Sequence, residues 1–249
     1  MTFLLPLLIR ELYEFKNNFF FVSLFWILLP VLFHILLAIP FSNIIPMDMR
    51  YLNWSAGGIW VVTSGLVAFL QSADRIRKIQ HESRQIEAFL KAPMTNLDLL
   101  IINVMRGFGY GLIQFVSAII ITSMLNNEYI GLSGILIITI QMLTLILHYA
   151  VLGTFFGMII IGRMLFTYIT LTLFLFTILG LGNFIPLQQY PESYKEMIEL
   201  IPITSAFSNI KSVIINAPFQ WLGFCFNLTG TIIIFIISLV ISHRTFRKI

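Results

Sequence analysis

Long apolar runs separated by short polar connections make up most of this chain. The runs are about twenty residues long, which at about 1.5 Å per helical residue spans a hydrocarbon core of about 30 Å. Lipid cannot hydrogen-bond a bare backbone, so each run must form a helix or a strand of a closed barrel. Barrel strands alternate apolar and polar positions, and runs such as 232–241 (IIIFIISLVI) do not. We therefore predict an all-α, multi-pass membrane protein with six spans at 19–39, 54–73, 107–125, 132–161, 165–183 and 221–241.

Two boundaries of these spans need a separate argument. Gly162 and Arg163 alone interrupt the apolar sequence 156–184. An arginine in mid-membrane would cost several kcal/mol, so we place Arg163 at a surface, in a turn between the fourth and fifth spans. The run 19–39 is too long for the apolar part of a signal peptide and lacks a small-x-small cleavage site. We expect it to be retained as the first helix.

Basic residues are distributed unevenly over the connections between the spans. If the N-terminus is cytoplasmic, twelve of them fall on the cytoplasmic side: Arg10, Lys16, Arg75, Arg77, Lys78, Arg84, Lys91, Arg106, Arg163, Arg244, Arg247 and Lys248. Only Arg50, Lys195 and Lys211 fall on the other side. Cytoplasmic connections of membrane proteins carry an excess of lysine and arginine. We therefore predict that both termini are cytoplasmic, which agrees with an even number of spans.

The composition excludes a soluble globular domain. The chain is 58% hydrophobic and 10% charged, with a mean hydropathy of +0.93, whereas soluble chains are about 25% charged. Its net charge of +4 comes mostly from residues near membrane surfaces and gives no indication of a nucleic-acid partner. The single cysteine, Cys225, excludes an internal disulfide and a cysteine-rich metal site. We expect one domain, 1–249, embedded in the lipid bilayer of a plasma or inner membrane.

A polar segment at 74–98 lies between the second and third spans. It holds five of the fifteen basic and four of the eleven acidic residues. Ile79, Ile86 and Leu90, with Phe89 beside them, recur near helical spacing, and charged residues fill the other faces. This pattern predicts a cytoplasmic helix that docks onto a soluble partner. The alternative is a loop whose charges keep it in water.

The same segment contains a stop signal followed by a start signal. Pro93 ends the predicted cytoplasmic helix. Thr95 and Asp98 have the spacing of an N-cap and capping box, in which each side chain bonds the other residue's backbone N–H. We therefore expect a new helix to begin just after Thr95.

Three further segments have the periodicity of amphipathic helices. Residues 2–18 (TFLLPLLIRELYEFKNN) predict an interface helix on the inner leaflet. Alternatively, they form the cytoplasmic end of the first span. Residues 194–201 and 204–215, in the long connection 186–220, predict two short helices at or within the outer leaflet. The alternative there is an ordinary extracellular loop.

Motifs for nucleotide binding, metal binding or catalysis are missing from the sequence. There is no G-x-x-x-x-G-K-S/T loop, so any ATP must be bound by another chain. The four histidines are scattered, and no H-E-x-x-H pattern occurs. Residues 131–134 (GLSG) match the G-x-S-G around the nucleophile of rhomboid-type proteases. However, Ser133 and His148 are fifteen residues apart on one predicted helix, about 22 Å, far beyond hydrogen-bond reach.

Few polar side chains fall within the predicted spans. We take His34, Gln114, Gln141 and His148 as candidates for a substrate path, since polar groups inside a membrane are often functional. The alternative for both histidines is an ordinary hydrogen bond between helices. The spans contain no Asp or Glu, which disfavours an ion-coupled pump.

Glycines near two of the spans predict close helix packing. Gly107, Gly109 and Gly111 open the third span, and Gly153 and Gly157 form a G-x-x-x-G on the fourth. Small residues let helix backbones approach one another in lipid.

The polar segment resembles a motif of the ABC-2 type transporter permeases. Residues 82–95 (ESRQIEAFLKAPMT) are similar to the family's E-x-G-T-L/I-E-x-L-L-x-x-P-L/M-S/T, which also lies between the second and third of six spans. The matching positions are Glu82, Ile86, Glu87, Leu90, Pro93 and Thr95. Arg84 and Gln85 replace the family's Gly-Thr, and Phe89 replaces a leucine. Residues 201–207 (IPITSAF), 244–248 and 8–12 resemble the family's last outside loop, basic C-terminus and opening interface helix.

The resemblance implies a membrane subunit of an ATP-driven exporter. On that basis Glu82, Arg84, Ile86, Glu87, Phe89, Leu90 and Pro93 form the coupling helix that docks onto the ATPase. It also implies a second permease copy or a paralogue, and an ATPase subunit that uses ATP and Mg²⁺. This chain would bind neither cofactor and would hold no catalytic residue.

The implied cargo is amphipathic or lipid-linked: a glycan, a lipid or a drug. Two alternatives remain open. One is the related permease of cytochrome c maturation, suggested by Gly58-Ile59-Trp60 at the start of the second span. The other is a membrane-embedded enzyme or a non-transport scaffold.

Overall fold

Helices account for all the regular secondary structure in the described part of the chain. The computed structural model describes residues 23–45, 51–81, 95–126 and 131–246. The predicted interface helix at 2–18 and the docking residues between Glu82 and Pro93 lie outside these ranges. Within them, six helices are long and apolar enough to cross a membrane: Ser23–Ser42, Tyr51–Ile79, Asn96–Asn126, Ser133–Ile159, Arg163–Gly180 and Trp221–His243. The predicted multi-pass, all-α class is therefore confirmed.

The first span ends in a π-helical turn, η1, and a short helix, α2. Of the elements that follow in the described ranges, only η2 and η3 are as short. In chain order they are η1 (His34–Ala38), α2 (Ile39–Ser42), α3 (Tyr51–His81), α5 (Asn96–Asn126), α6 (Leu132–Ile159), α7 (Arg163–Leu175), η2 (Phe176–Gly180), η3 (Leu187–Gln189), α8 (Glu192–Glu199), α9 (Pro202–Ile214) and α10 (Trp221–Phe246).

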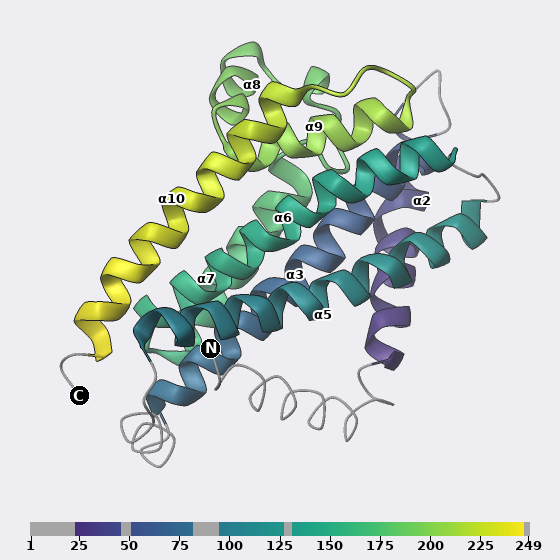
Figure 1. The fold of residues 1–249 in the computed structure, drawn as a ribbon. Helices are drawn as coiled ribbons and strands as arrows, with labels where there is room; N and C mark the ends of the chain where they lie inside the picture. The colour runs from purple at the N-terminus through teal and green to yellow at the C-terminus, as the bar shows by residue number, and fades with distance from the viewer. Residues whose placement is uncertain (1–22, 46–50, 82–94, 127–130, 247–249) are drawn as a thin grey trace.

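Successive spans run in opposite directions, so helix ends gather at two ends of the molecule (Figure 1). One end holds the C-terminal ends of α3, α6 and α10 and the N-terminal ends of α5 and α7. We call it the basic end, because Arg75, Arg77, Lys78 and Arg163 belong to its helices. The other end holds the start of α3 and the short helices α8 and α9, and we call it the α8–α9 end.

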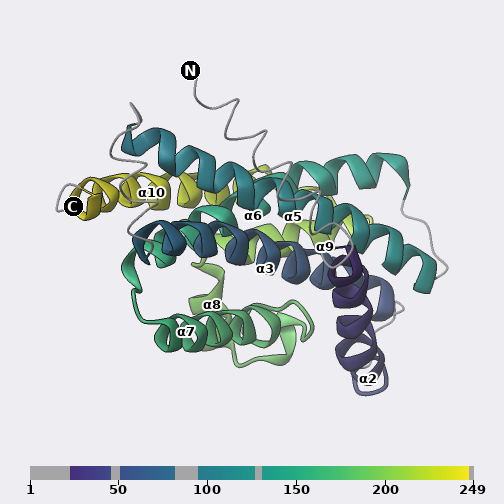
Figure 2. The same ribbon diagram turned by 90° about the horizontal axis from the view of Figure 1, so that it is seen from below.

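Helix α3 forms the centre of the molecule. Figure 2 shows it between α5 and α6 on one side and α7 on the other. Phe69, midway along α3, is fully buried, and its ring contacts Phe166 and Phe174 of α7 at centroid distances of 6.0 and 5.6 Å. By contrast, α7 and α10 expose rows of large apolar side chains, as expected of helices that face lipid.

Glycines set the distance of α3 from α5 and α6. A Cβ atom on Gly153 of α6 would lie 2.2 Å from the carbonyl oxygen of Phe69, and one on Gly107 of α5 would lie 2.5 Å from that of Ala68. Both are backbone obstacles that cannot rotate away. The predicted role of these glycines in packing is confirmed, but Gly109 has nothing within 4 Å and takes no part in it.

The start of the polar segment belongs to the second span, and here the sequence prediction was wrong. Helix α3 continues past residue 73 to His81. Ile79, assigned to the docking face, is buried in a cluster with Leu99, Leu100 and Met158. Arg75 is buried as well, while Asp74 and Lys78 pair at 2.7 Å on the exposed side. The predicted span ended at residue 73 because hydropathy detects only the apolar part of a helix. The charged residues within 74–78 lie on the continuation of the same helix.

The capping box and the turn at Arg163 were predicted correctly. The Thr95 backbone N–H donates to the Asp98 carboxylate (3.0 Å), and the Asp98 N–H donates to the Thr95 hydroxyl (3.2 Å). Helix α5 therefore begins at Asn96, eleven residues before the predicted span. Residues 160–162 are non-helical, and α7 begins at the exposed Arg163.

The long connection before the last span contains the two predicted short helices, α8 and α9. Helix α8 is mostly exposed. Helix α9, however, is not a surface helix, because Thr204, Asn209 and Lys211 on it are buried. It packs against α3, α6 and α10.

Candidate functional site

The four polar residues proposed for a substrate path do not converge on one site. Gln114 of α5 donates from its side-chain amide to the carbonyl of Trp26 (3.2 Å), and Ser117 donates to the same carbonyl (3.1 Å). These bonds tie α5 to the first span. His34 is buried in η1, and its Nδ1 has no hydrogen-bond partner among the described residues.

Gln141 and His148, in contrast, belong to one buried polar surface. They lie seven residues apart, and therefore on the same face of α6, about 10 Å along its axis. The Gln141 side-chain oxygen accepts a hydrogen bond from Asn209 of α9 (3.2 Å). His148 Nδ1 lies 2.8 Å from the hydroxyl of Thr231 on α10. The hydrogen bond between helices that was the alternative for His148 is therefore present, and its place on a substrate path stays a prediction.

Helix α10 completes this surface, and its fully buried residues are all small or polar, with Ile234, Phe235 and Leu239 packed beside them as partly buried apolar residues. Its buried residues are Gly223, Asn227, Thr231, Ser238 and Ser242. The isoleucines of α10 at 232, 233, 236 and 237 are exposed instead. Because lipid is as apolar as isoleucine, helices in a membrane associate through small and polar contacts. We call the contact between α6, α9 and α10 the polar seam.

Asn209 fixes the start of α10 to α9 within the seam. Its amide donates to the carbonyl of Gln220 (2.9 Å), and its side-chain oxygen accepts from the Gln220 backbone N–H (3.1 Å). Ser205, one turn earlier on α9, donates to the carbonyl of Gly223 (3.1 Å). A helix start leaves backbone N–H groups without an intrahelical acceptor, and Asn209 supplies one for the Gln220 N–H. The two bonds to carbonyls add further links between α9 and the start of α10.

Two residues leave hydrogen-bonding capacity unused inside the seam. Asn227 is fully buried, and neither its Oδ1 nor its Nδ2 has a partner among the described residues. The Thr204 hydroxyl is in the same state. Buried polar atoms are usually satisfied by protein or by ordered water.

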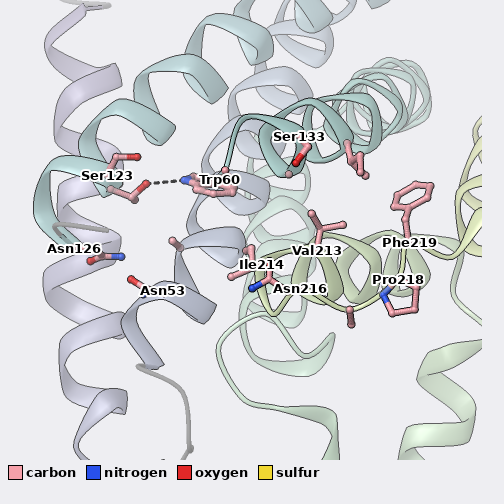
Figure 3. A pocket seen from close by; sticks show the side chains of 16 residues that line it. Asn53, Trp60, Ser123, Asn126, Ser133, Val213, Ile214, Asn216, Pro218 and Phe219 are labelled. Carbon is pink, nitrogen blue, oxygen red and sulfur yellow. Dashed lines mark hydrogen bonds between the residues drawn. The ribbon is translucent and has the colours of Figure 1, made fainter. Parts of the chain in front are cut away.

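A separate cavity of about 490 Å³ lies at the α8–α9 end, between α3, α5, α6 and the segment after α9 (Figure 3). It is lined by Asn53, Ala56, Trp60, Thr122, Ser123, Asn126, Gly131, Ser133, Gly134, Ile137, Val213, Ile214, Asn216, Ala217, Pro218 and Phe219. None of these lining residues is charged. The Trp60 indole N–H donates to the Thr122 hydroxyl (2.7 Å), which joins α3 to α5 in the cavity wall.

The two residues of the apparent protease motif, Ser133 and His148, lie in different parts of the molecule. Ser133 lines the cavity, whereas His148 is bonded to Thr231 in the seam. The prediction that they form no Ser–His pair is consistent with this placement.

Lys211 connects α9, which forms part of the cavity wall, to the segment after η2. Its Nζ donates to the carbonyls of Gly182 and Asn183, the latter at 2.9 Å, and lies 3.3 Å from the centre of the Trp54 ring. Burial lowers the pKa of Lys211 well below its usual value. Sequence analysis assigned this residue to the charges of an outer loop, because α9 could not be recognised as buried from periodicity alone.

At the basic end, Arg77 links α3 to the turn before α7. Its guanidinium donates to the carbonyl of Ile161 (3.4 Å) and lies 4.2 Å from the centre of the Phe166 ring. The C-terminal end of α3, just before the motif at 82–95, is therefore attached to the turn that leads into the fifth span.

Sequence analysis missed Asn209, Asn227 and Lys211. For Asn227 a signal existed, since Asn227 and Thr231 are polar, are spaced by one helical turn and lie in a mostly apolar run. Comparison with protein families and with curated proteins found no match to this chain. Among the described residues, no group of three or more His, Cys, Asp or Glu side chains is placed to hold a metal ion.

Proposed function

We propose that this chain is the permease subunit of an ATP-driven ABC exporter of the ABC-2 type. The observation that carries the proposal is the place of the polar segment. Helix α3 ends and α5 begins at the basic end, and the motif at 82–95 lies between them in the sequence, on the side where an ATPase in the cytoplasm would meet the chain. The six spans and the pair of short helices before the last one support the same proposal.

Helix α3 is well suited to transmit movement from that segment. It is one continuous helix of 31 residues, about 46 Å long at about 1.5 Å per residue. Its C-terminal end leads into the motif, and Asn53, Ala56 and Trp60 near its start line the cavity. Packed helices shift as bodies because close-packed interfaces resist continuous deformation.

The attachments at the basic end define what would move together with the polar segment. Ile76 and Ile79 of α3 pack with Leu99 and Leu100 of α5, so both sides of the segment are anchored in one cluster. Arg77 adds the turn before α7. ATP binding in the partner would then favour one of two arrangements of these helices by several kcal/mol.

In this proposal the chain itself performs no chemistry on ATP. ATP and Mg²⁺ are used by a separate ATPase subunit, and a second permease copy or a paralogue completes the path through the membrane. The cargo is amphipathic or lipid-linked. Both termini and the basic end face the cytoplasm.

Affinity purification in mild detergent tests the docking site directly. We expect the wild-type chain to bring down a partner that carries a phosphate-binding Walker motif, and Glu87→Arg to lose it. The matched control is Glu196→Arg, the same charge reversal on exposed α8 at the other end of the molecule. It should retain the partner at the wild-type level.

Two results would contradict the proposal. The absence of any ATPase from a well-folded wild-type preparation would favour a scaffold or an enzyme. Equal loss of the partner in both variants would show that charge in general, and not the motif, holds the complex together.

A further inference from the structure

The cavity at the α8–α9 end has a neutral, hydrogen-bonding chemistry. Amide side chains line it at Asn53, Asn126 and Asn216, and hydroxyl groups line it at Ser123 and Ser133 (Figure 3). Each such group can both donate and accept hydrogen bonds. This distinguishes the cavity from the spans around it, whose side chains toward lipid are apolar.

Charged ligand groups fit this lining poorly. Phosphate and carboxylate groups are usually held by arginine, lysine or converging backbone N–H groups, and none of the lining residues carries a positive charge. Lys211 is on the same helix as Val213 and Ile214 of the wall, but its Nζ is bonded to two carbonyls and covered by Trp54. Cationic groups likewise find no carboxylate among the described residues that line the cavity.

The protein itself supplies hydrogen-bond partners for only part of the Asn126 side-chain amide. Its Nδ2 donates to the carbonyl of Leu52 (3.1 Å), which fixes the orientation of the amide. Its Oδ1 is buried and has no partner among the described residues.

Apolar and aromatic groups form the rest of the wall. Trp60, Ile137 and Phe219 are the largest of them, and a mixed wall of this kind suits a molecule with polar edges and apolar C–H faces. A volume of about 490 Å³ lies within the usual range of small-molecule sites, about 300–1,000 Å³. Sugars have these properties: many hydroxyl groups, no charge and C–H faces that pack on aromatic rings.

We propose that this cavity binds a neutral sugar group. As the recognition site of the exporter's cargo, it rests on the proposed function, but sugar binding itself can be measured without an ATPase. The sugar can belong to a free oligosaccharide or to the headgroup of a glycolipid, since both present the same hydroxyl groups.

The first test uses ligand-observed saturation-transfer NMR on the protein in phosphatidylcholine nanodiscs, prepared without glycoside detergents. The probes are maltose, which is neutral, and glucose 6-phosphate, which is anionic. The second test uses nanodiscs that contain digalactosyldiacylglycerol and measures by native mass spectrometry how much of it stays bound. Maltose signals indicate a free sugar as ligand, and retention of the glycolipid alone indicates a lipid-borne one.

Three variants make the test specific. Asn126→Leu removes one amide from the lining at similar volume, and Ser123→Ala/Ser133→Ala removes two hydroxyl groups without adding bulk. We expect at least a tenfold weakening of sugar binding for the first and about fivefold for the second. Gln188→Leu, an exposed position on η3, is the matched control and should bind as the wild type does.

The proposal is overturned if neither maltose nor the glycolipid binds, or if glucose 6-phosphate binds as well as maltose. It is also overturned if Ser123→Ala/Ser133→Ala, which should fold normally, binds like the wild type. Failure of the exporter proposal would look different: the ATPase would be missing from the affinity purification whether or not sugar binds.

Discussion

Lys211 is a lysine buried in the described core. A lysine that loses its water shell must regain that free energy from protein groups. Here two backbone carbonyls and the face of Trp54 take the place of water. These partners favour the charged form, while burial opposes it and lowers the pKa of Lys211 well below its usual value.

The direction of this pKa shift predicts how stability depends on pH. Between the lowered pKa in the folded protein and the usual value of about 10.5, the unfolded chain binds more protons than the folded one. Stability therefore rises with pH in that window. We expect the melting temperature of the wild type to rise between pH 7 and pH 9.5 relative to Lys211→Met, measured by intrinsic fluorescence in nanodiscs.

Lys195→Met on α8 is the control for this experiment, because the Lys195 side chain is 43% exposed and pairs only at 3.9 Å with Glu199. It should follow the pH profile of the wild type. If the profile of Lys211→Met also follows that of the wild type, the expected lowering of the Lys211 pKa is absent. The two carbonyls and the Trp54 ring would then keep Lys211 protonated in the folded protein.

At the scale of the helices, close approach between α3 and α6 is the main constraint on packing. Gly153 lies where any side chain would meet the backbone of α3. Overpacking of this kind costs about 1–3 kcal/mol, and more where the obstacle cannot move. We expect Gly153→Ala to lower the melting temperature clearly, by the same measurement.

Gly109→Ala is the opposite case within the neighbouring helix α5. A Cβ atom there meets nothing within 4 Å, and alanine is favoured over glycine in a helix by about 0.8–1.0 kcal/mol. We expect this variant to be unchanged or slightly stabilised. A similar loss of stability in both variants would mean that the two helix contacts do not differ as the structure indicates.

The spans could be predicted from the sequence because their physical cause is local. An apolar run of about twenty residues needs no knowledge of its neighbours, and neither does the capping box at Thr95 and Asp98. The extension of α3 to His81 was missed because a helix continues through polar residues whenever one face stays buried. That face is formed by Ile76 and Ile79 against α5, and the contact is not visible in a local pattern.

The candidate sites depend on contacts between distant segments and were predicted only in part. Gln141 and His148 stood out because they are isolated polar residues in an apolar helix. Asn209 and Lys211 did not, because polar residues are ordinary on an amphipathic segment. The cavity was not predicted at all, since its wall comes from three spans, the end of α9 and the segment after it.

At the scale of the whole molecule, the two ends differ in charge and in shape. Arg75, Arg77, Lys78 and Arg163 belong to the basic end, and the α8–α9 end holds the cavity. The excess of basic residues predicts that the basic end faces the cytoplasm. The exporter proposal requires the same orientation, because ATP is available only on that side.

Cysteine labelling tests this orientation in intact cells. Cys225→Ser removes the only cysteine, and Lys78→Cys and Glu196→Cys then place one exposed thiol at each end. We expect a membrane-impermeant maleimide to label Glu196→Cys from outside and Lys78→Cys only after permeabilisation. The reverse pattern would place the polar segment on the side without ATP. It would end the exporter proposal and leave the six-helix fold intact, because the packing around α3 does not depend on which end faces the cytoplasm.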